Sequence, residues 1–598
     1  MKLYKISLAL MLGIGTLTSC SDKLELTNPN QPTTGTFGNT VEDLEEAVIA
    51  CYHHIRMEGT YARVGYTLDL VRGDEAWNSA QGWGYYLADK LSPSTTDEIY
   101  ALWPWRDWYY VINISNFVIT KCNEEAELST AKQRLKGQAL FIRALAYYNL
   151  AGYYQNPSLI LDYNDYSTLD GLYASNIEEG DASEFDQYDR VMDQVETDFA
   201  EALSLLPAKT EGGEWTKGRA TKGAAAGFYA RALMQRHKYS EALSLLERII
   251  NKEFGEYKLM DNYGDNFREG SAYENNAESL FEVQFLDYGT QGTDDEWTPV
   301  NISKNASQGH AVESNFGPGD FGGWADISAA PWLYHLFVDG DKTKDGHLDP
   351  RLYWTIGTYE SDWDTYKKEL GTEGNVCYQS PMTEDAPVVT NNNNGGLPIA
   401  KWTNMRTGLY NSVVVGLKCG INLRLMRYSD VLLRAAECEN EISGPTQRAI
   451  DWINQVRQRA GLADLKLSDF AGDADKLFEQ IANVERPKEF GCEYGRGFDL
   501  QRWGFFYRND RMEQMKQHTA YKLSTDKSTV KNAVKYGDTG VECSSSTYLD
   551  GHEFYPIWQT TLNDNPNLVG NSANETVNNS FYFSNKGWTI HPVVDLTK

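Results

Sequence analysis

Apolar side chains recur at helical spacing along the first half of the chain. Between residues 40 and 56 they stand at positions 41, 44, 48, 51/52 and 55, a period close to that of an α-helix. The same pattern returns in residues 98–122, 129–154 and 187–207, where Pro207 ends the last run. The pattern therefore predicts a largely helical first half.

Residues 219–254 indicate how such helices pack. Small side chains line one predicted helix at Ala220, Ala224, Gly227 and Ala230, and a second amphipathic helix follows a turn at residues 237–238. Small residues let two helix axes approach closely, so we expect an antiparallel pair similar to a tetratricopeptide repeat. The earlier helices fit the same architecture, which predicts about four pairs stacked into a curved scaffold.

The helical signal fades between residues 255 and 421, where only short strand-like runs such as 279–285 interrupt a loop-rich composition. Helices return at 422–442, at 446–462 and near Leu477. We therefore predict a mainly α fold: one domain, 39–598, with a tetratricopeptide-like helical-pair scaffold and a loop-rich, irregular ligand-binding insertion. The scaffold comprises 39–254 and 422–510, the insertion 255–421, and an irregular C-terminal segment 511–598.

The first residues resemble a targeting segment rather than part of the fold. Lys2 and Lys5 precede a short apolar run that ends in "LTSC", residues 17–20, which is typical of a bacterial lipobox. We predict a signal peptide over 1–19, lipidation of Cys20 and a flexible tether over 20–38, with an ordinary secretory signal as the alternative. The expected location is the outer membrane, at the cell surface, through the lipid anchor.

The net charge limits the expected classes of ligand, and the cysteine spacing limits the expected disulfides and metal sites. The net charge of −29 repels nucleic acid phosphates and anionic lipid headgroups, so we expect no nucleic acid partner and favour a neutral or cationic ligand. No C-x-x-C pair occurs among the eight cysteines, which favours buried free thiols, with one disulfide left open. No phosphate-binding loop, zinc motif or nucleophile elbow is present, so we expect no cofactor.

The segment 485–504 alternates charge within twenty residues, interleaved with aromatic side chains. Guanidinium and carboxylate groups pair in bidentate fashion, so we predict an ion-pair network that braces the last helices. The rival interpretation is a pair of catalytic carboxylates. The charged residues concerned are Glu485, Arg486, Glu489, Arg496, Asp499 and Arg502.

Several motifs in a fixed order carry a family likeness. They are "RLKGQALFIRALAYYNL" (134–150), "RYSDVLLRAAE" (427–437), "INQVRQRAGL" (453–462), "ERPKEFGCEYGRGFDLQRWG" (485–504) and "NPNL" (565–568). With the lipobox, this set resembles the SusD/RagB outer-membrane lipoproteins of Bacteroidetes across essentially the whole mature chain. Tyr494, where the family usually has Gly, and Trp558 in the end motif depart from the pattern.

The resemblance implies a binding protein and not an enzyme. Proteins of this family form a lid over a SusC-like TonB-dependent transporter in the outer membrane, capture glycan and deliver oligosaccharide to the pore. One alternative is the capture of peptides by the same lid, as in the RagB branch. The other is a surface glycoside hydrolase, because a glycosidase needs only two carboxylates brought together in space.

Two aromatic, loop-like stretches are the predicted glycan-binding positions. Aromatic rings stack on the C–H face of a sugar, while Asp and Asn side chains reach its hydroxyl groups. The resemblance places both stretches where the family binds glycan. The first, "WNSAQGWGYY" and the residues before it, contributes Asp74, Trp77, Asn78, Trp83, Tyr85 and Tyr86, and the second contributes Trp297, Phe321 and Trp324. Packing of these rings onto the scaffold remains the alternative.

Other aromatic and acidic positions are assigned to structure. Trp103, Trp105, Trp108, Tyr109 and Tyr110 lie on a periodic helix and are expected mostly in the core, as are Trp452 and Trp503. Asp339, Asp341 and Asp345 begin like a calcium loop, but Lys344 and Pro350 stand where an EF-hand needs Gly and Glu. A solvated acidic turn is therefore favoured over a metal site.

Overall fold

The computed structural model describes residues 37–78, 85–89, 94–178, 181, 186–211, 213–286, 309–317, 323–324, 326–357, 397–404, 419–519, 521–524, 540–543, 554–570 and 582–597. Eight long helices form a row in which each contacts the next. In order of contact these are α2 (Val41–His54), α6 (Trp103–Asn123), α7 (Thr130–Tyr154), α9 (Asp186–Leu205), α10 (Lys222–Gln235), α11 (Tyr239–Ile250), α16 (Tyr428–Ser443) and α17 (Gln447–Arg459). Taken two by two, they form four pairs, which confirms the predicted helical-pair scaffold.

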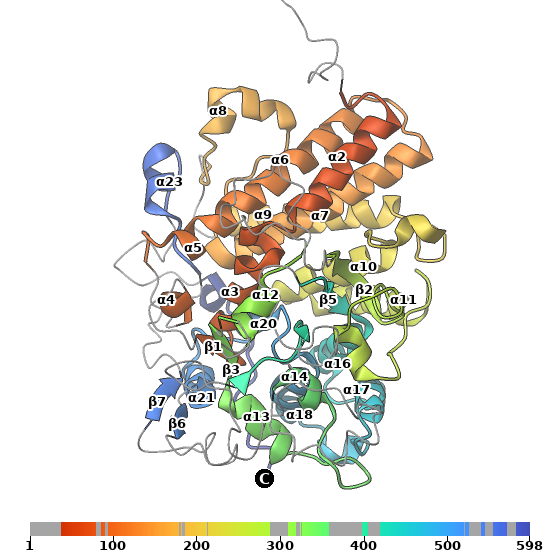
Figure 1. Cartoon of the computed structure of the whole chain (residues 1–598), viewed down its shortest axis with the longest axis vertical. Coiled ribbons are helices and arrows are strands. Elements are labelled where there is room, and N and C mark those ends of the chain that lie inside the picture. The colour runs from red at the N-terminus through yellow and green to blue at the C-terminus, as the bar shows by residue number, and fades with distance from the viewer. Residues whose placement is uncertain are drawn as a thin grey trace, which may run out of the picture.

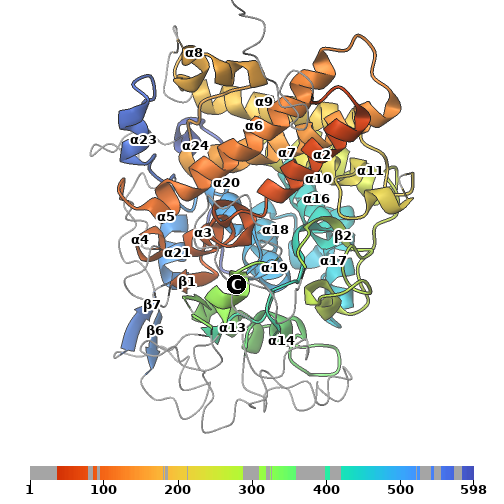
Figure 2. The ribbon, with the colours of Figure 1, turned by 45° about the horizontal axis from the view of Figure 1, so that its top comes forward.

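Figure 1 shows this row running down the molecule. Helices α2, α6, α7 and α9 lie at one end, α10 and α11 in the middle, and α16 and α17 toward the other end. The turned view in Figure 2 keeps the same order. The small residue at Gly227 serves a different contact from the expected helix–helix one, because a Cβ there would lie 2.4 Å from the sulfur of Met426 on strand β5 (Leu423–Arg427).

Shorter elements complete the scaffold around this row. The early ones are a π-helical turn η1 (Glu58–Ala62), α3 (Val64–Arg72), α4 (Tyr85–Asp89), α5 (Glu98–Ala101), η2 (Tyr163–Ser167), α8 (Leu169–Leu172), η3 (Gly213–Thr216) and η4 (Tyr263–Phe267). The later ones are α12 (Val312–Phe316), α13 (Pro331–Val338), α14 (Arg351–Thr355), η10 (Leu467–Asp469), α18 (Ala474–Gln480), η11 (Ile481–Glu485), α19 (Arg486–Phe490), α20 (Arg496–Arg502), α21 (Asn509–Thr519), α23 (Gln559–Asp564) and α24 (Tyr582–Asn585).

Three small antiparallel sheets are present in the described part of the chain. One has the order β1 (Ala76–Asn78), β3 (Ile327–Ala329), β4 (Leu397–Pro398); the others pair β2 (Ser279–Val283) with β5 (Leu423–Arg427) and β6 (Tyr521–Ser524) with β7 (Gly540–Cys543). The strand at 279–283 confirms the expected one. Residues 423–427, predicted as the start of a helix, are a strand instead, because every side chain of this segment is buried against β2 and its neighbours.

The core takes most of the aromatic side chains that the sequence assigns to it. Trp105, Trp108, Trp452 and Trp503 are buried, as expected. On α6, Trp103 and Tyr109 are half-buried and pack against the core, whereas Tyr110 is 36% exposed, so the core assignment is wrong for Tyr110. The described cysteines whose side chains are placed are free and buried, in agreement with the sequence: Cys51, Cys122, Cys419, Cys438 and Cys492.

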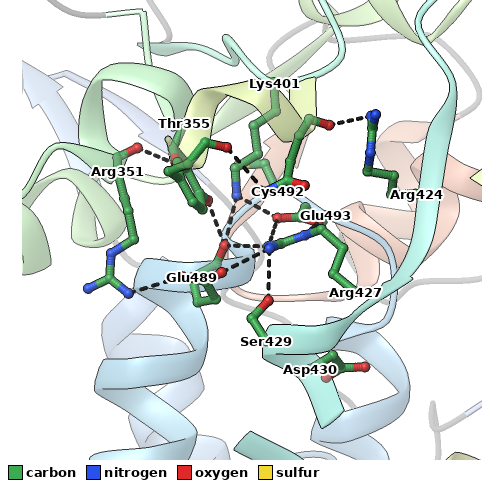
Figure 3. A network of polar contacts seen from close by, with 12 residues as sticks. Arg351, Thr355, Lys401, Arg424, Arg427, Ser429, Asp430, Glu489, Cys492 and Glu493 are labelled. Carbon is green, nitrogen blue, oxygen red and sulfur yellow. Dashed lines mark hydrogen bonds and ion pairs between the residues drawn. The ribbon is translucent and has the colours of Figure 1, made fainter. Parts of the chain in front are cut away.

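A buried ion-pair network joins the C-terminal helices to the rest of the molecule, and this confirms the prediction from the 485–504 motif. Glu489 is fully buried and accepts hydrogen bonds from Arg427 (2.9 Å), Arg351 (3.2 Å) and Arg459. Figure 3 shows Arg427 between Glu489 and Glu493, to which it also donates. Because these arginines come from β5, α14 and α17, one carboxylate fixes three elements.

A second cluster repeats the arrangement around Asp499. Its carboxylate accepts hydrogen bonds from Arg434, Arg486 and Arg502, with the shortest at 2.6 Å from Arg486. Glu437 in turn accepts from Arg502 and from the Trp503 indole N–H. All of these groups are buried and saturated by opposite charge, so they serve the scaffold and do not form an accessible pair of catalytic carboxylates.

Candidate ligand-binding site

The two described rings of the first predicted aromatic group, Trp77 and Tyr85, are part of the core. Trp77 lies in β1 opposite Ser328 of β3 and is only 3% exposed, and Tyr85 is fully buried. The expectation of exposed rings is therefore wrong for these two residues. Asn78, on the same strand, is also buried. The physical reason is that this strand of three residues is covered by α3 and α4 and is buried on both faces. It therefore lacks the alternation of apolar and polar residues that marks a strand in the sequence.

Asp74 supports the scaffold in place of its expected role as a hydrogen-bond partner for ligand. It is fully buried, accepts hydrogen bonds from Arg496 at 2.8 and 3.0 Å, and lies 2.8 Å from Nδ1 of His518. Burial alone would raise the pKa of Asp74, but the charge of Arg496 and the hydrogen bond from His518 hold it below its ordinary value. The carboxylate therefore stays ionised and committed to partners within the chain.

Several predicted positions fall outside the described residues. These are Trp83, Trp297 and Phe321, the side chain of Tyr86, and the N-terminal segment with Cys20. Their proposed roles remain predictions. Trp324 is described, and the structure places it at a half-buried position beside β3.

A close contact between the backbone at residues 314–317 and the backbone at residues 323–324, which we call the neck, fixes the position of Trp324. Its N–H donates to the carbonyl of Ser314, at 2.7 Å. A Cβ on the preceding residue, Gly323, would lie 1.9 Å from the carbonyl oxygen of Gly317, so only glycine allows the two chain segments to meet there. The neck holds the Trp324 backbone against α12 at the place where the chain enters the small sheet.

A buried arginine joins Trp324 to Trp103. The guanidinium carbon of Arg63 lies 5.5 Å from the ring centre of Trp324 and 5.7 Å from that of Trp103, both within cation–π range. Arg63 is fully buried and forms an ion pair with Glu58, whereas both indoles are half-buried. We call Trp103, Arg63 and Trp324 the indole–arginine site.

The turn before Arg63 explains how this arginine reaches the two rings. Within η1, a Cβ on Gly59 would lie 2.3 Å from the carbonyl oxygen of Trp103, so the turn packs directly onto the start of α6. The N–H of Gly59 donates to Asp107, at 2.8 Å, which ties the same turn to α6 one helical turn later. Arg63, the residue that follows this turn, therefore lies next to Trp103.

Sequence reasoning missed both Arg63 and Trp103. Trp103 was grouped with the core rings of its helix, but Pro104 directly after it marks the first turn of α6. A residue at the start of a helix has only part of a helical turn packed around it and is therefore less buried. The proline, which favours the first turn of a helix, was the signal that Trp103 lies at such a position. Arg63 carries no local signal, because its aromatic neighbours are distant in sequence.

Carboxyl groups around the site balance its charge. Burial raises the pKa of Asp326 to about 6, an effect that the charge of Arg63 partly offsets. Burial likewise raises the pKa of Asp107 to about 6, against the charge of Arg106. The site therefore combines half-buried aromatic surface with a compensated cation, which suits a flat, uncharged ligand and offers no activated nucleophile.

The described residues contain no group of three His, Cys, Asp or Glu side chains placed to hold a metal ion. In the acidic turn that resembles a calcium loop, Asp341 accepts a hydrogen bond from Arg457, at 2.8 Å, and Asp339 lies 3.0 Å from Nδ1 of His335. No helix within the described ranges is long and apolar enough to cross a membrane.

Comparison with known proteins agrees with the geometry. One family model, described as the SusD family, matches residues 277–574, and a second, described as "Starch-binding associating with outer membrane", matches residues 24–234. The SusD-like protein P2 of Formosa agariphila is 24% identical over 510 residues, which is 84% of this chain and 91% of that protein.

Solved structures share the fold at low identity. A SusD homolog from Bacteroides thetaiotaomicron gives a TM-score of 0.68 at 20% identity, over 90% of this chain and 98% of that one. Surface glycan-binding protein A from the same organism, in complex with laminarihexaose, gives 0.62 at 20% identity, over 89% and 99%. Scaffold, ordered motifs and family models agree: the chain belongs to the SusD/RagB family.

Proposed function

We propose that this protein binds glycan at the cell surface and delivers it to a SusC-like TonB-dependent transporter. The observation that carries the proposal is the indole–arginine site, in which two half-buried indoles flank a guanidinium that is itself fully buried. An indole offers a flat apolar face to the C–H groups of a sugar ring at little cost in conformational entropy. A structural relative of this chain was solved with laminarihexaose bound, which supports the same class of ligand here.

The chemistry of the site favours an uncharged glycan. Arg63 is paired with Glu58 and also lies near Asp326, so little positive charge remains to attract an anionic sugar. The chain as a whole carries a charge of −29, which repels sulfated or uronic acid polysaccharides over several ångströms. Neutral glucans and related glycans are therefore the ligand class that we propose. Trp83, Tyr86, Trp297 and Phe321 are proposed as further contacts.

The proposal is tested by isothermal titration of the mature chain against a panel of neutral and acidic polysaccharides. We expect binding to at least one neutral member and none to the acidic ones. Failure to bind any glycan, by protein shown to be folded by circular dichroism, would contradict the proposal. Reducing-sugar release by purified protein would establish the hydrolase alternative, and peptides that co-purify with the transporter complex would favour peptide capture.

The membrane anchor has its own test. If Cys20 carries the lipid, radiolabelled palmitate is incorporated into the wild-type protein and not into the Cys20→Ala variant, which should leave the outer-membrane fraction. A variant that remains at the membrane and labelled would contradict anchoring at Cys20. Co-purification with a TonB-dependent barrel, before and after Cys20→Ala, separates the transporter contact from the lipid contact.

A further inference from the structure

A small cavity lies between α10, β5 and the segment 486–499. Its volume is about 20 Å³, which is enough for one small occupant. Five arginines line it, against four acidic residues. The arginines are Arg231, Arg424, Arg427, Arg486 and Arg496, and the acids are Glu75, Asp430, Glu493 and Asp499.

Arg231 lines this cavity and has donors that make no hydrogen bond, beside a cation–π contact of its guanidinium with Phe228 at 5.2 Å. It is 4% exposed, and only its Nη2 has acceptors, the carboxylate of Asp430 at 3.1 Å and the carbonyl of Leu425 at 3.3 Å. Its Nε and Nη1 are buried and make no hydrogen bond. A guanidinium can only donate, so whatever occupies the cavity must accept. Buried donors left without an acceptor are costly, which makes an empty cavity unfavourable.

The backbone leaves room beside this guanidinium. Gly495 has a φ of +122°, a conformation that side chains rarely adopt, and the nearest atoms to a Cβ at this position belong to Arg231, at 3.5 to 3.9 Å. Any larger residue would be strained and would fill the space beside this guanidinium, where Nη2 is the nearest atom and Nη1 lies 3.9 Å away. The glycine therefore preserves the cavity at the point where Arg231 faces it.

The carboxylates around the cavity are already occupied. Asp430 accepts from Arg231, Arg434 and Arg486. Asp499 also accepts from three arginines, and Glu493 accepts from Lys401 and Arg427. Each of these carboxylates is thus already paired with cations of the chain.

Glu75, the fourth acid, adds no opposing charge near neutral pH. Its Oε1 makes no hydrogen bond, and burial raises its pKa to about 8, although Arg496 partly offsets that effect. A protonated carboxyl offers a further O–H donor. A single water accepts about two hydrogen bonds, whereas a monatomic anion accepts from every donor around it.

We propose that this cavity is a binding site for a small inorganic anion of the halide class, with Arg231 as its principal ligand. The anion holds β5 and α10 to the segment that follows Gly495, and so stabilises the junction between the two halves of the scaffold. This inference is independent of the proposed glycan binding, because the site is internal and distinct from the indole–arginine site.

The experiment is thermal unfolding of the mature chain in sodium chloride and in sodium gluconate at equal ionic strength. Gluconate is too large for the cavity and serves as the control for ionic strength. We expect chloride to raise the melting temperature by about 1–3 °C over gluconate, by mass action on the folded state. The increment should vanish in Arg231→Gln and persist in Arg248→Gln, a surface arginine paired with Glu253.

A bromide-soaked crystal of the wild-type protein decides the question without any variant. An anomalous peak within about 3.5 Å of Arg231 Nε or Nη1 supports the site. The absence of a peak there, with water refined at full occupancy, overturns the proposal, as does an equal melting temperature in the two salts.

Discussion

The buried carboxylate of Glu489 offers the sharpest test of the scaffold, through the substitution Glu489→Gln. The carboxylate is fully buried and accepts from Arg351, Arg427 and Arg459. Burial alone would raise the pKa of Glu489, but these three arginines outweigh it and hold the pKa well below its ordinary value. Glutamine keeps the shape but removes the charge, and its amide adds N–H donors toward a cluster of guanidinium groups.

The expected cost follows from the class of interaction. Removing one partner of a buried ion pair leaves uncompensated charge and costs about 3–5 kcal/mol. Over 598 residues, an unfolding entropy of about 2.1 cal/mol/K per residue converts this loss into a fall in melting temperature of about 2–4 °C. Urea denaturation followed by tryptophan fluorescence measures the free energy directly.

A matched control and a second variant make the result specific. Glu256→Gln removes an exposed pair with Lys252 and should leave the urea midpoint unchanged. Adding Arg459→Met to Glu489→Gln removes one of the uncompensated charges, so the double variant should be less destabilised than the sum of the single variants. A Glu489→Gln protein within 1 kcal/mol of wild type would refute the reasoning, because a buried network of this kind cannot lose its central charge without cost.

Three further predictions concern pH and the indole–arginine site. The pKa of Glu75, raised by burial to about 8, means that the folded state holds a proton which the unfolded state loses near its ordinary pKa. The free energy of unfolding should therefore fall between about pH 5 and 8, and Glu75→Gln should remove that part of the fall in urea titrations. Burial alone would lower the pKa of His591, but Glu441 and Asp475 raise it, so its stabilising effect is present below about pH 6.5 and is lost as pH rises through the raised pKa. Hydrogen-exchange protection factors of residues 587–597, taken relative to the intrinsic rate at each pH, should therefore fall at high pH in wild type and be low already at pH 6 in His591→Gln. Gly323→Ala, which forces a Cβ against Gly317, should displace Trp324 and weaken glycan binding by about tenfold while the urea midpoint changes little; unchanged affinity would contradict the role of the neck.

The helices could be predicted because their information is local. In α10 and α11 the small residues and the turn stand next to one another in sequence, and the pair forms as the period indicates. The ion-pair network could also be predicted from the 485–504 motif. Alternating charges interleaved with aromatic rings can be buried together only if the opposite charges pair. Strand β5 could not be predicted in this way, because Arg424 and Arg427 look like solvent-facing helix positions although each is buried in an ion pair.

The ligand site depends on contacts that local patterns do not encode. The polar neighbours of Trp77 predict an exposed ring, but its strand pairs with β3, some 250 residues away in sequence, and is covered by α3 and α4. Trp103 and Trp324 meet only through Arg63, which sits on a third element. Composition identified Trp324 as a candidate, and only the folded chain shows which ring it accompanies.

The central claim is that Trp103 and Trp324 form a glycan-binding surface, and titration of single alanine variants against the tightest neutral glycan tests it most directly. We predict that Trp103→Ala and Trp324→Ala each lose about 1–3 kcal/mol of binding free energy, or roughly 5- to 150-fold in Kd. Trp558→Ala, a half-buried indole at the start of α23, should bind like wild type. Wild-type affinity in both site variants, with the fold intact, would contradict the account.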